Sequence, residues 1–202
     1  MKTKKGFTLL ELLIVIGILA ILSTTMILVI NPAEMLRKAR DSQRISDLST
    51  LKSAIAYYIT SVGIPYIGTS TYSYSVITNI SCPGAASTSA TSSQAVNGNG
   101  WIPVYFATIT GGSPIGSLPI DPNPTALTPS PLTKARYYVY TPYTTDFTFE
   151  LLANMESLYY SKDGDGDVEN KDGGVIAQIY EVGTRLGIVT ASSSTCLAGD
   201  GT

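Results

Sequence analysis

The chain of 202 residues has no histidine, one tryptophan and only two cysteines. The lack of histidine excludes imidazole-based catalytic triads, and the absence of a Cys/His cluster excludes a zinc site of the usual kind. The sequence also lacks a Gly-x-Ser-x-Gly elbow and a phosphate-binding Walker loop. No motif marks a catalytic pair among its acidic residues. We therefore expect a protein that is not an enzyme and that has no organic cofactor.

Charged residues are also scarce, at 14% of the chain, and they are unevenly distributed. Residues 31–62 carry five basic and three acidic side chains, whereas residues 63–202 carry five basic and eleven acidic ones. The acidic character of residues 63–202 argues against nucleic-acid binding by that region as a whole. A local basic patch remains compatible with this composition, but no specific nucleic-acid site is evident.

A long apolar run dominates the N-terminal part of the chain. The 24 residues from Phe7 to Ile30 include a single charged side chain, Glu11. As an α-helix, this run is long enough to cross a bilayer core about 30 Å thick. Lys2, Lys4 and Lys5 precede it without any acid. By the positive-inside rule, the N-terminus should stay in the cytoplasm and the remainder should cross the membrane.

Glu11 is unfavourable in such a run, because a carboxylate near the centre of a spanning helix costs about 2.5–3.5 kcal/mol. One interpretation is that the side chain reaches back to the lipid headgroups. The other is that Glu11 has a partner. If the chain is cut after Gly6, Phe7 gains a positive α-amine, which would attract Glu11 of a neighbouring copy strongly in a low-dielectric array.

The segment Lys4-Lys5-Gly6-Phe7-Thr8-Leu9-Leu10-Glu11-Leu12 resembles the class III signal of type IV pilins and type II secretion pseudopilins. That family has a short basic leader, Gly before the cleavage site, Phe after it and Glu four residues further on, and each feature is present here. The apolar run is too long for the core of an ordinary secretory signal peptide. A simple signal anchor is the remaining alternative.

The resemblance implies that prepilin peptidase cleaves between Gly6 and Phe7 and N-methylates Phe7. It also implies a homo-polymeric filament in which Glu11 meets the Phe7 amine of an adjacent subunit. The precursor would lie in the cytoplasmic membrane with an extracytoplasmic head, engage the pilus assembly platform and end in an extracellular filament. The alternatives are a pseudopilin of a secretion or DNA-uptake machine and, from another class, a signal-anchored binding protein.

The helical pattern continues beyond the apolar run and divides the chain into a leader (1–6), a helix (7–62) and a head (63–202). Gly17 and the pair Asn31-Pro32 are the expected weak points, where the helix kinks or restarts. Residues 31–62 are amphipathic, with apolar side chains at three- and four-residue steps. These are Ile45, Leu48, Leu51, Ile55, Tyr58, Ile59 and Val62. Arg37 with Asp41, and Asp41 with Arg44, are expected to form ion pairs on the helix surface.

In the head, residues 135–140 and 147–151 predict two strands joined by a turn near Pro142, and hence an antiparallel hairpin. Residues 101–122 and 149–157 also resemble the heads of pseudopilin-like bacterial pilins, less closely than the N-terminus does. We therefore expect an α+β, pilin-like fold, in which a long N-terminal helix packs against a small antiparallel sheet.

The acidic segment beginning at Asp163 is a candidate metal site. Asp163, Asp165 and Asp167 alternate with glycine, so that several oxygens could face one hard cation such as Ca²⁺. The pattern departs from an EF-hand, because Val168 occupies the turn position and Gly174 the position of the bidentate Glu. A calcium site in the C-terminal loop region of major pseudopilins adds support by resemblance. The alternative is a solvated acidic loop.

The two cysteines, Cys82 and Cys196, both fall in the part expected outside the cytoplasm, where disulfides persist. A bond between them would close a loop of about 115 residues, and the chain-entropy model values it at up to about 4–5 kcal/mol. We expect this disulfide rather than two free thiols.

Overall fold

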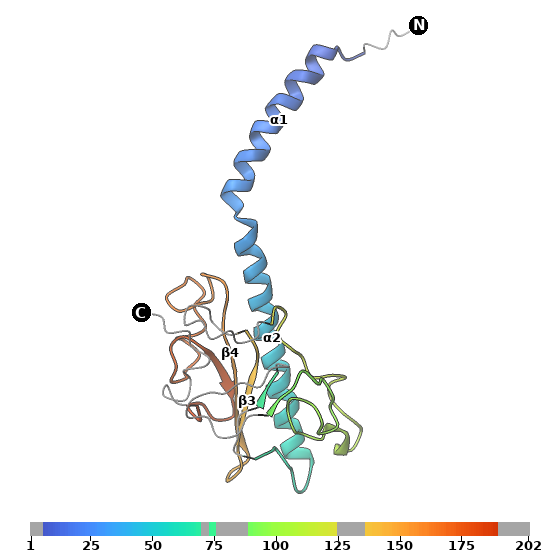
Figure 1. Cartoon of the computed structure of the whole chain (residues 1–202), viewed down its shortest axis with the longest axis vertical. Coiled ribbons are helices and arrows are strands. Elements are labelled where there is room, and N and C mark those ends of the chain that lie inside the picture. Colours follow the sequence, from blue (N-terminus) through green and yellow to red (C-terminus); the bar gives the residue numbers. More distant parts are fainter. Residues whose placement is uncertain (1–5, 70–72, 76–88, 125–135, 190–202) are drawn as a thin grey trace. The chain divides into compact units, whose positions relative to one another are not determined.

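The computed structural model describes residues 6–69, 73–75, 89–124 and 136–189 (Figure 1). The chain divides into two compact parts, an N-terminal unit (Met1–Arg37) and a globular unit (Lys38–Thr202). Helix α2 crosses the boundary between them, so the globular unit contains most of that helix as well as the head.

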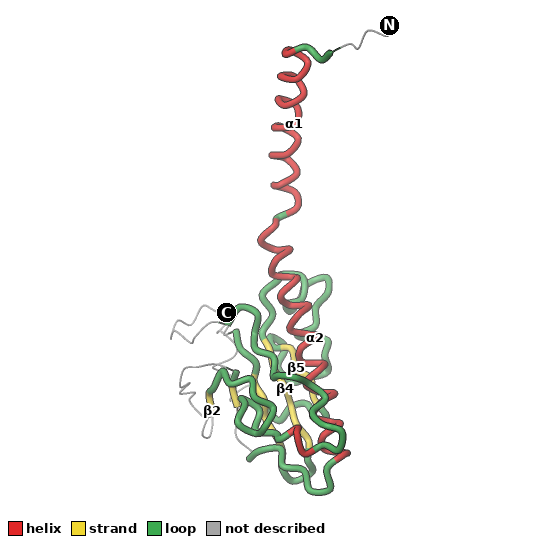
Figure 2. The backbone as a smooth tube through the Cα atoms, turned by 90° about the vertical axis from the view of Figure 1, so that its right-hand side faces the viewer, coloured by secondary structure: helices red, strands yellow, loops and turns green. Residues whose placement is uncertain are grey.

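The N-terminal unit consists of helix α1 (Leu9–Ile30) and the start of helix α2 (Pro32–Ser61). Asn31 separates the two helices in a left-handed conformation, with φ of 44° and ψ of 76°, which asparagine tolerates better than most residues (Figure 2). Its side chain accepts a hydrogen bond from the amide of Glu34, and Pro32 occupies the first helical position. Of the two alternatives at Asn31-Pro32, a kink or a restart, the structure has one helix ending at Ile30 and the next beginning at Pro32. Helix α1 continues through Gly17 without a break.

Within the globular unit, α2 presents its predicted apolar stripe to the head. Leu48, Leu51, Ile55 and Tyr58 are buried, and Ile59 and Val62 pack against the same core. The helix ends at Ser61, just before Gly63, as predicted. Three- and four-residue spacing places all of these side chains on one face, so their burial fixes the rotation of α2 about its axis.

The sheet of the globular unit has the strand order β2-β1-β3-β4-β5. Its centre is the antiparallel hairpin of β3 (Val139–Tyr143) and β4 (Thr148–Ala153), and β5 (Tyr180–Gly183) pairs antiparallel with β4. The predicted hairpin is present, but the predicted turn position was wrong, because Pro142 lies inside β3 and pairs with Phe149. Two short strands complete it: β1 (Ser73–Tyr74) lies antiparallel to β3, and β2 (Ser89–Ala90) lies parallel to β1. The α+β, pilin-like fold class is thereby confirmed.

The main core lies between α2 and the sheet. Alternate strand residues contribute to it, including Tyr140, Phe149 and Leu151, and Tyr138, which directly precedes β3, joins them. Trp101 is fully buried among them and donates its indole N–H to the carbonyl of Pro119 at 2.9 Å. The opposite face of β3 and β4 is buried as well, at Val139, Thr141, Glu150 and Leu152. Burial of the Glu150 carboxylate on this face costs free energy. Hydrogen bonds from the backbone amides of Gly187 and Val189 to the carboxylate offset that cost.

Candidate functional site

The site predicted by the sequence begins at the residues just before α1. Gly6, Phe7 and Thr8 adopt no regular secondary structure, and Phe7 is 89% exposed. Thr8 is the N-cap of α1, with an extended backbone at φ −81° and ψ 152°. The Gly6–Phe7 peptide therefore lies outside the helix, two residues before its first turn.

Thr8 and Glu11 form a capping box, the reciprocal arrangement of an N-cap side chain and the acid three residues later. The hydroxyl of Thr8 accepts the amide N–H of Glu11 at 3.2 Å. In return, the Oε2 atom of Glu11 accepts the backbone N–H and the hydroxyl of Thr8, each at 2.9 Å. The carboxylate therefore has partners within its own chain, which reduces the cost of placing it in an apolar segment.

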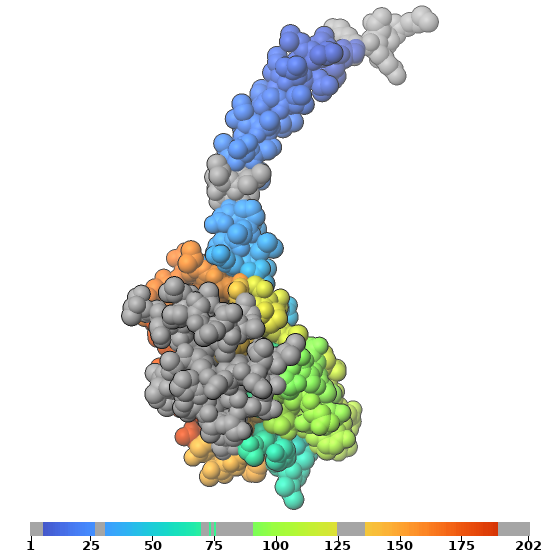
Figure 3. Space-filling model, in the orientation of Figure 1, coloured from blue at the N-terminus to red at the C-terminus, as the bar shows by residue number. Residues whose placement is uncertain are grey.

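Helix α1 is long and apolar enough to span a membrane. Residues 9–26 have a mean hydropathy of 2.4, and none of this window is buried in the structure (Figure 3). Leu9, Leu10 and Ile21 each expose two thirds or more of their surface. A helix that is apolar on all sides is stable in lipid or in a packed assembly rather than at a water-exposed surface.

Residues 1–27 match the family described as the prokaryotic N-terminal methylation motif. No curated protein and no solved structure matches the chain. The matched segment corresponds to the class III signal peptide of type IV pilins and pseudopilins. This motif points to a structural protein that is processed by prepilin peptidase and anchored in a membrane. The remaining residues lie beyond the matched segment.

Gly6 and Phe7 lie just before α1 and Glu11 lies in its first turn, and their roles in processing and assembly stay predictions. The other predicted residues of the helix lie further along it, with Gly17 inside α1 and Pro32 at the start of α2. A role for Gly17 and Pro32 as flexible points in a filament stays a prediction. Cys82 and Cys196 lie outside the described residues, so their disulfide also stays a prediction.

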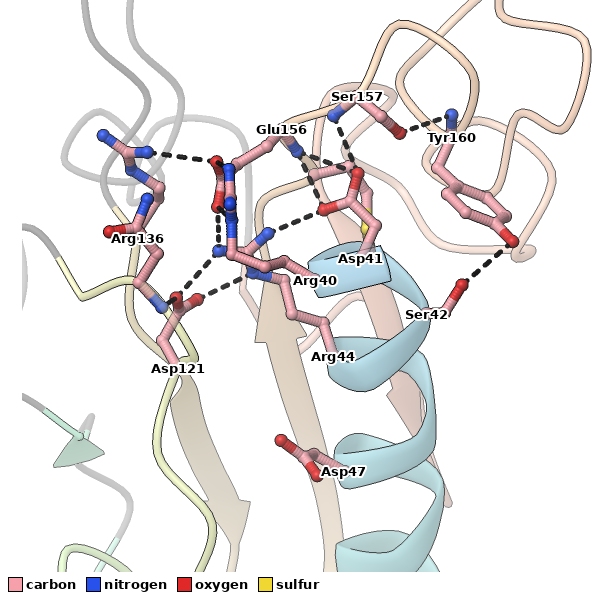
Figure 4. A network of polar contacts seen from close by, with 12 residues as sticks. Arg40, Asp41, Ser42, Arg44, Asp47, Asp121, Arg136, Glu156, Ser157 and Tyr160 are labelled. Carbon is pink, nitrogen blue, oxygen red and sulfur yellow. Dashed lines mark hydrogen bonds and ion pairs between the residues drawn. The ribbon is translucent and has the colours of Figure 1, made fainter. Parts of the chain in front are cut away.

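A buried ionic network, which sequence reasoning missed, joins α2 to the loops of the globular unit (Figure 4). Its centre is Arg44, whose side chain is fully buried. The guanidinium donates two hydrogen bonds to Asp121, at 2.8 and 2.7 Å, and also contacts Glu156. Arg40 donates to both carboxylate oxygens of Glu156 and Arg136 donates to Oε2, so that three cations contact one carboxylate.

Asp41 completes the network from the adjacent turn of α2. Its carboxylate accepts a hydrogen bond from Arg44 at 2.7 Å and from the backbone amides of Glu156 and Ser157 (Figure 4). The predicted Asp41–Arg44 pair is thus present, but its position on the helix surface was wrong, because both side chains are fully buried. Arg37 instead forms an ion pair with Glu34. The three-residue spacing of Asp41 and Arg44 predicts that the two side chains pair, but it gives no information on whether the head buries them.

Burial, hydrogen bonds and neighbouring charges shift the pKa values of Arg44 and Glu156. Burial alone would lower the pKa of Arg44, but its hydrogen bonds and charge interactions with Asp121, Glu156 and Asp41 outweigh burial and raise it. Burial acts to raise the pKa of Glu156, but Arg40 and Arg44 lower it to about 2. Arg44 and Glu156 are therefore both ionised near neutral pH, and the network attaches α2 to the head.

The acidic loop predicted to bind calcium uses part of its charge to organise its own backbone. Asp167 accepts hydrogen bonds from the amides of Asp163 and Asn170, and Glu169 accepts them from Met155 and Lys162. Among the residues that the structure describes, no three acidic, cysteine or histidine side chains are grouped as metal ligands. Asp163 and Asp165 are exposed. Calcium binding by Asp163, Asp165 and Asp167 stays a prediction.

The same use of carboxylates recurs on the second, buried face of the sheet. Glu150 accepts hydrogen bonds from the amides of Gly187 and Val189, while Glu181 accepts them from Val175 and Ile176. Burial raises the pKa of Glu181 to about 7, and the nearby charges of Glu150 and Asp172 contribute to the increase. These acids hold irregular segments in place by binding backbone amides that no strand partner satisfies.

Proposed function

We propose that this protein is a pilin, the structural subunit of a type IV pilus-like filament. Prepilin peptidase cleaves the precursor after Gly6 and methylates the new N-terminal residue, Phe7. The mature subunits then polymerise through α1, and their heads form the outer surface of the filament. The observation that carries this proposal is the N-terminal methylation motif at residues 1–27, which includes an apolar helical window, Leu9–Met26, that the structure leaves unburied.

The exposed apolar surface of α1 supports storage in the membrane and assembly into a filament core. The lipid bilayer and the filament core would each cover the apolar side chains of α1 that are exposed in the single chain. Because the subunit moves from lipid rather than from water, hydrophobic burial contributes little to the transfer. Packing between helices and pairing of polar groups therefore determine the register of the filament.

Glu11 supplies the polar group for that pairing. After cleavage, the α-amine of Phe7 carries a positive charge, and the carboxylate of Glu11 in an adjacent subunit is its partner. The described hydrogen bonds of Glu11 use its Oε2 atom and its backbone amide. Its Oε1 atom remains available for the amine of a neighbour while the capping box persists.

The decisive experiment is identification of the N-terminal residue of the mature protein by mass spectrometry. The proposal predicts N-methylated Phe7, with residues 1–6 removed. An unprocessed, monomeric membrane protein would contradict it and would favour a signal-anchored binding protein.

Electron microscopy of the producing cells separates the alternatives within the class. Abundant surface filaments that contain this chain support a pilus subunit. Processed protein that stays at low abundance in the cell envelope would instead indicate a pseudopilin of a secretion or DNA-uptake machine.

A further inference from the structure

The N-terminal boundary of α1 lies next to the bond that the proposed function requires a peptidase to cleave. Thr8 ends the non-helical segment and Leu9 begins the helix. Gly6 and Phe7 are both exposed, and a Cβ atom placed on Gly6 would meet no other atom within 4 Å. The Gly6–Phe7 peptide is therefore accessible from several directions.

The position of this boundary matters because a helical peptide is a poor protease substrate. In an α-helix, the carbonyl and amide groups are hydrogen-bonded along the axis and are unavailable to an enzyme that binds extended chain. Leu9, Leu10 and Glu11 are strong helix formers, and lysine is tolerated well in helices, whereas Phe7 and Thr8 are weaker helix formers and Gly6 is a poor one. A helix that began a few residues earlier would include the Gly6–Phe7 peptide.

We propose that the Thr8–Glu11 capping box stops α1 at Leu9 and thereby keeps the Gly6–Phe7 bond in the non-helical form that the peptidase cleaves. This inference rests on the proposed function. Thr8 is a positioning residue, since it acts on the conformation of the bond and not on the reacting atoms. Its extended backbone and its hydroxyl, which accepts the amide N–H of Glu11 at 3.2 Å, together define the helix start.

The geometry separates the roles of Thr8 and Glu11. The hydrogen bond from the residue-11 amide to the Thr8 hydroxyl uses the backbone of residue 11, so it survives when the side chain of Glu11 is replaced. Only the return bonds from Thr8 to the carboxylate are lost. Thr8 therefore governs cleavage, whereas Glu11 governs assembly.

The test uses the full-length precursor in phosphatidylethanolamine–phosphatidylglycerol vesicles with purified prepilin peptidase, and it measures kcat/KM for removal of residues 1–6. Thr8→Val, which keeps the shape of threonine but cannot cap, should decrease kcat/KM about fivefold, equivalent to ~1 kcal/mol. Thr8→Ser and Thr8→Asn, which cap well, should stay within about twofold of the wild type.

Thr24→Val is the matched control. Thr24 is an exposed threonine of α1 whose hydroxyl donates to the carbonyl of Ala20, away from the cleavage site. This variant should be cleaved at the wild-type rate, which shows that loss of a threonine hydroxyl from α1 does not by itself slow the reaction.

Two results would overturn the inference. If Thr8→Val is cleaved as fast as the wild type, capping does not control the bond. If Thr8→Asn is as slow as Thr8→Val, the peptidase recognises the threonine side chain directly. In both cases the wild-type precursor is still cleaved after Gly6. A wild-type precursor that is never cleaved there contradicts the proposed function instead, so the two failures are distinguishable.

Discussion

Arg44 and Asp121 are 77 residues apart in the sequence and form a two-pronged ion pair in which both side chains are fully buried. Two parallel hydrogen bonds between a guanidinium and a carboxylate fix orientation as well as distance. The pair therefore determines how the loop that carries Asp121 sits on α2. Together with the contacts of Asp41 and Arg44 to Glu156, it attaches the helix of the globular unit to two separate parts of the chain (Figure 4).

Replacing Arg44 should be strongly destabilising. Arg44→Met leaves Asp41, Asp121 and Glu156 without their shared buried partner, and removal of one member of a buried ion pair costs about 3–5 kcal/mol. Arg40→Met is the matched control, because the Arg40 side chain is 29% exposed and Glu156 keeps two other cations. Arg40→Met should lower the free energy of unfolding by about 1 kcal/mol or less. Urea unfolding of the full chain in detergent measures both, and equal costs would contradict a special role for Arg44.

The stability of the globular unit should decrease as the pH rises through neutrality. Burial raises the pKa of Glu181 from 4.5 to about 7, so the folded state binds its proton more tightly than the unfolded state does. The resulting stabilisation is complete below pH 4.5 and is lost as the pH rises through about 7. Burial raises the pKa values of Glu150 and Asp172 as well, which acts in the same direction.

Thermal unfolding at about pH 5.5 and about pH 8.5 checks this expectation, with the lower midpoint at the higher pH. Glu181→Gln should reduce the difference between the two midpoints. Glu156→Gln is the control, since the pKa of Glu156 is about 2 and this group does not titrate in that range. A wild-type midpoint that is the same at both pH values would show that Glu181 is ionised throughout.

Glu11→Val should block assembly but not processing. The variant keeps the apolar run and the cap provided by Thr8, so insertion and cleavage should proceed. Loss of the carboxylate removes the partner of the Phe7 amine, and a loss of ~1.4 kcal/mol per contact already decreases association about tenfold. The measurement is the yield of sheared filaments relative to processed subunit. Glu34→Val serves as the control, and normal filaments from Glu11→Val would exclude the charge-pairing mechanism.

Calcium should raise the melting midpoint of the globular unit if Asp163, Asp165 and Asp167 bind it together. The response should disappear in an Asp163→Asn/Asp165→Asn variant, because two charged oxygen ligands are removed. Asp146→Asn, a change at an exposed acid between β3 and β4, should keep the response. Identical midpoints with calcium and with chelator would leave a solvated acidic loop that is organised by its own carboxylates.

The intact mass of the protein tests the predicted Cys82–Cys196 disulfide. Reduction should add the mass of two hydrogen atoms, and it should lower the unfolding midpoint because a constraint worth up to about 4–5 kcal/mol is lost. The Cys82→Ser variant provides the reference for a chain without the bond. An unchanged mass on reduction would indicate two free thiols.

The sequence by itself determined the features that depend on neighbouring residues. The apolar run, the spacing of Gly6, Phe7 and Glu11, and the helix restart at Asn31-Pro32 all follow from composition and local hydrogen bonding. The buried stripe of α2 and the β3–β4 hairpin follow from hydrophobic periodicity. Each of these signals lies within a few turns of helix or one strand pair, so no knowledge of distant segments is needed.

Only the tertiary structure decided where the charged side chains of the globular unit lie. Composition assigns Asp41, Arg44 and Glu156 to the surface, because isolated buried charges are costly. The cost is offset here by partners that are remote in the sequence, such as Asp121 for Arg44 and the amides of Glu156 and Ser157 for Asp41. Such pairings exist only after the loops have packed, so a local sequence pattern carries no signal for them.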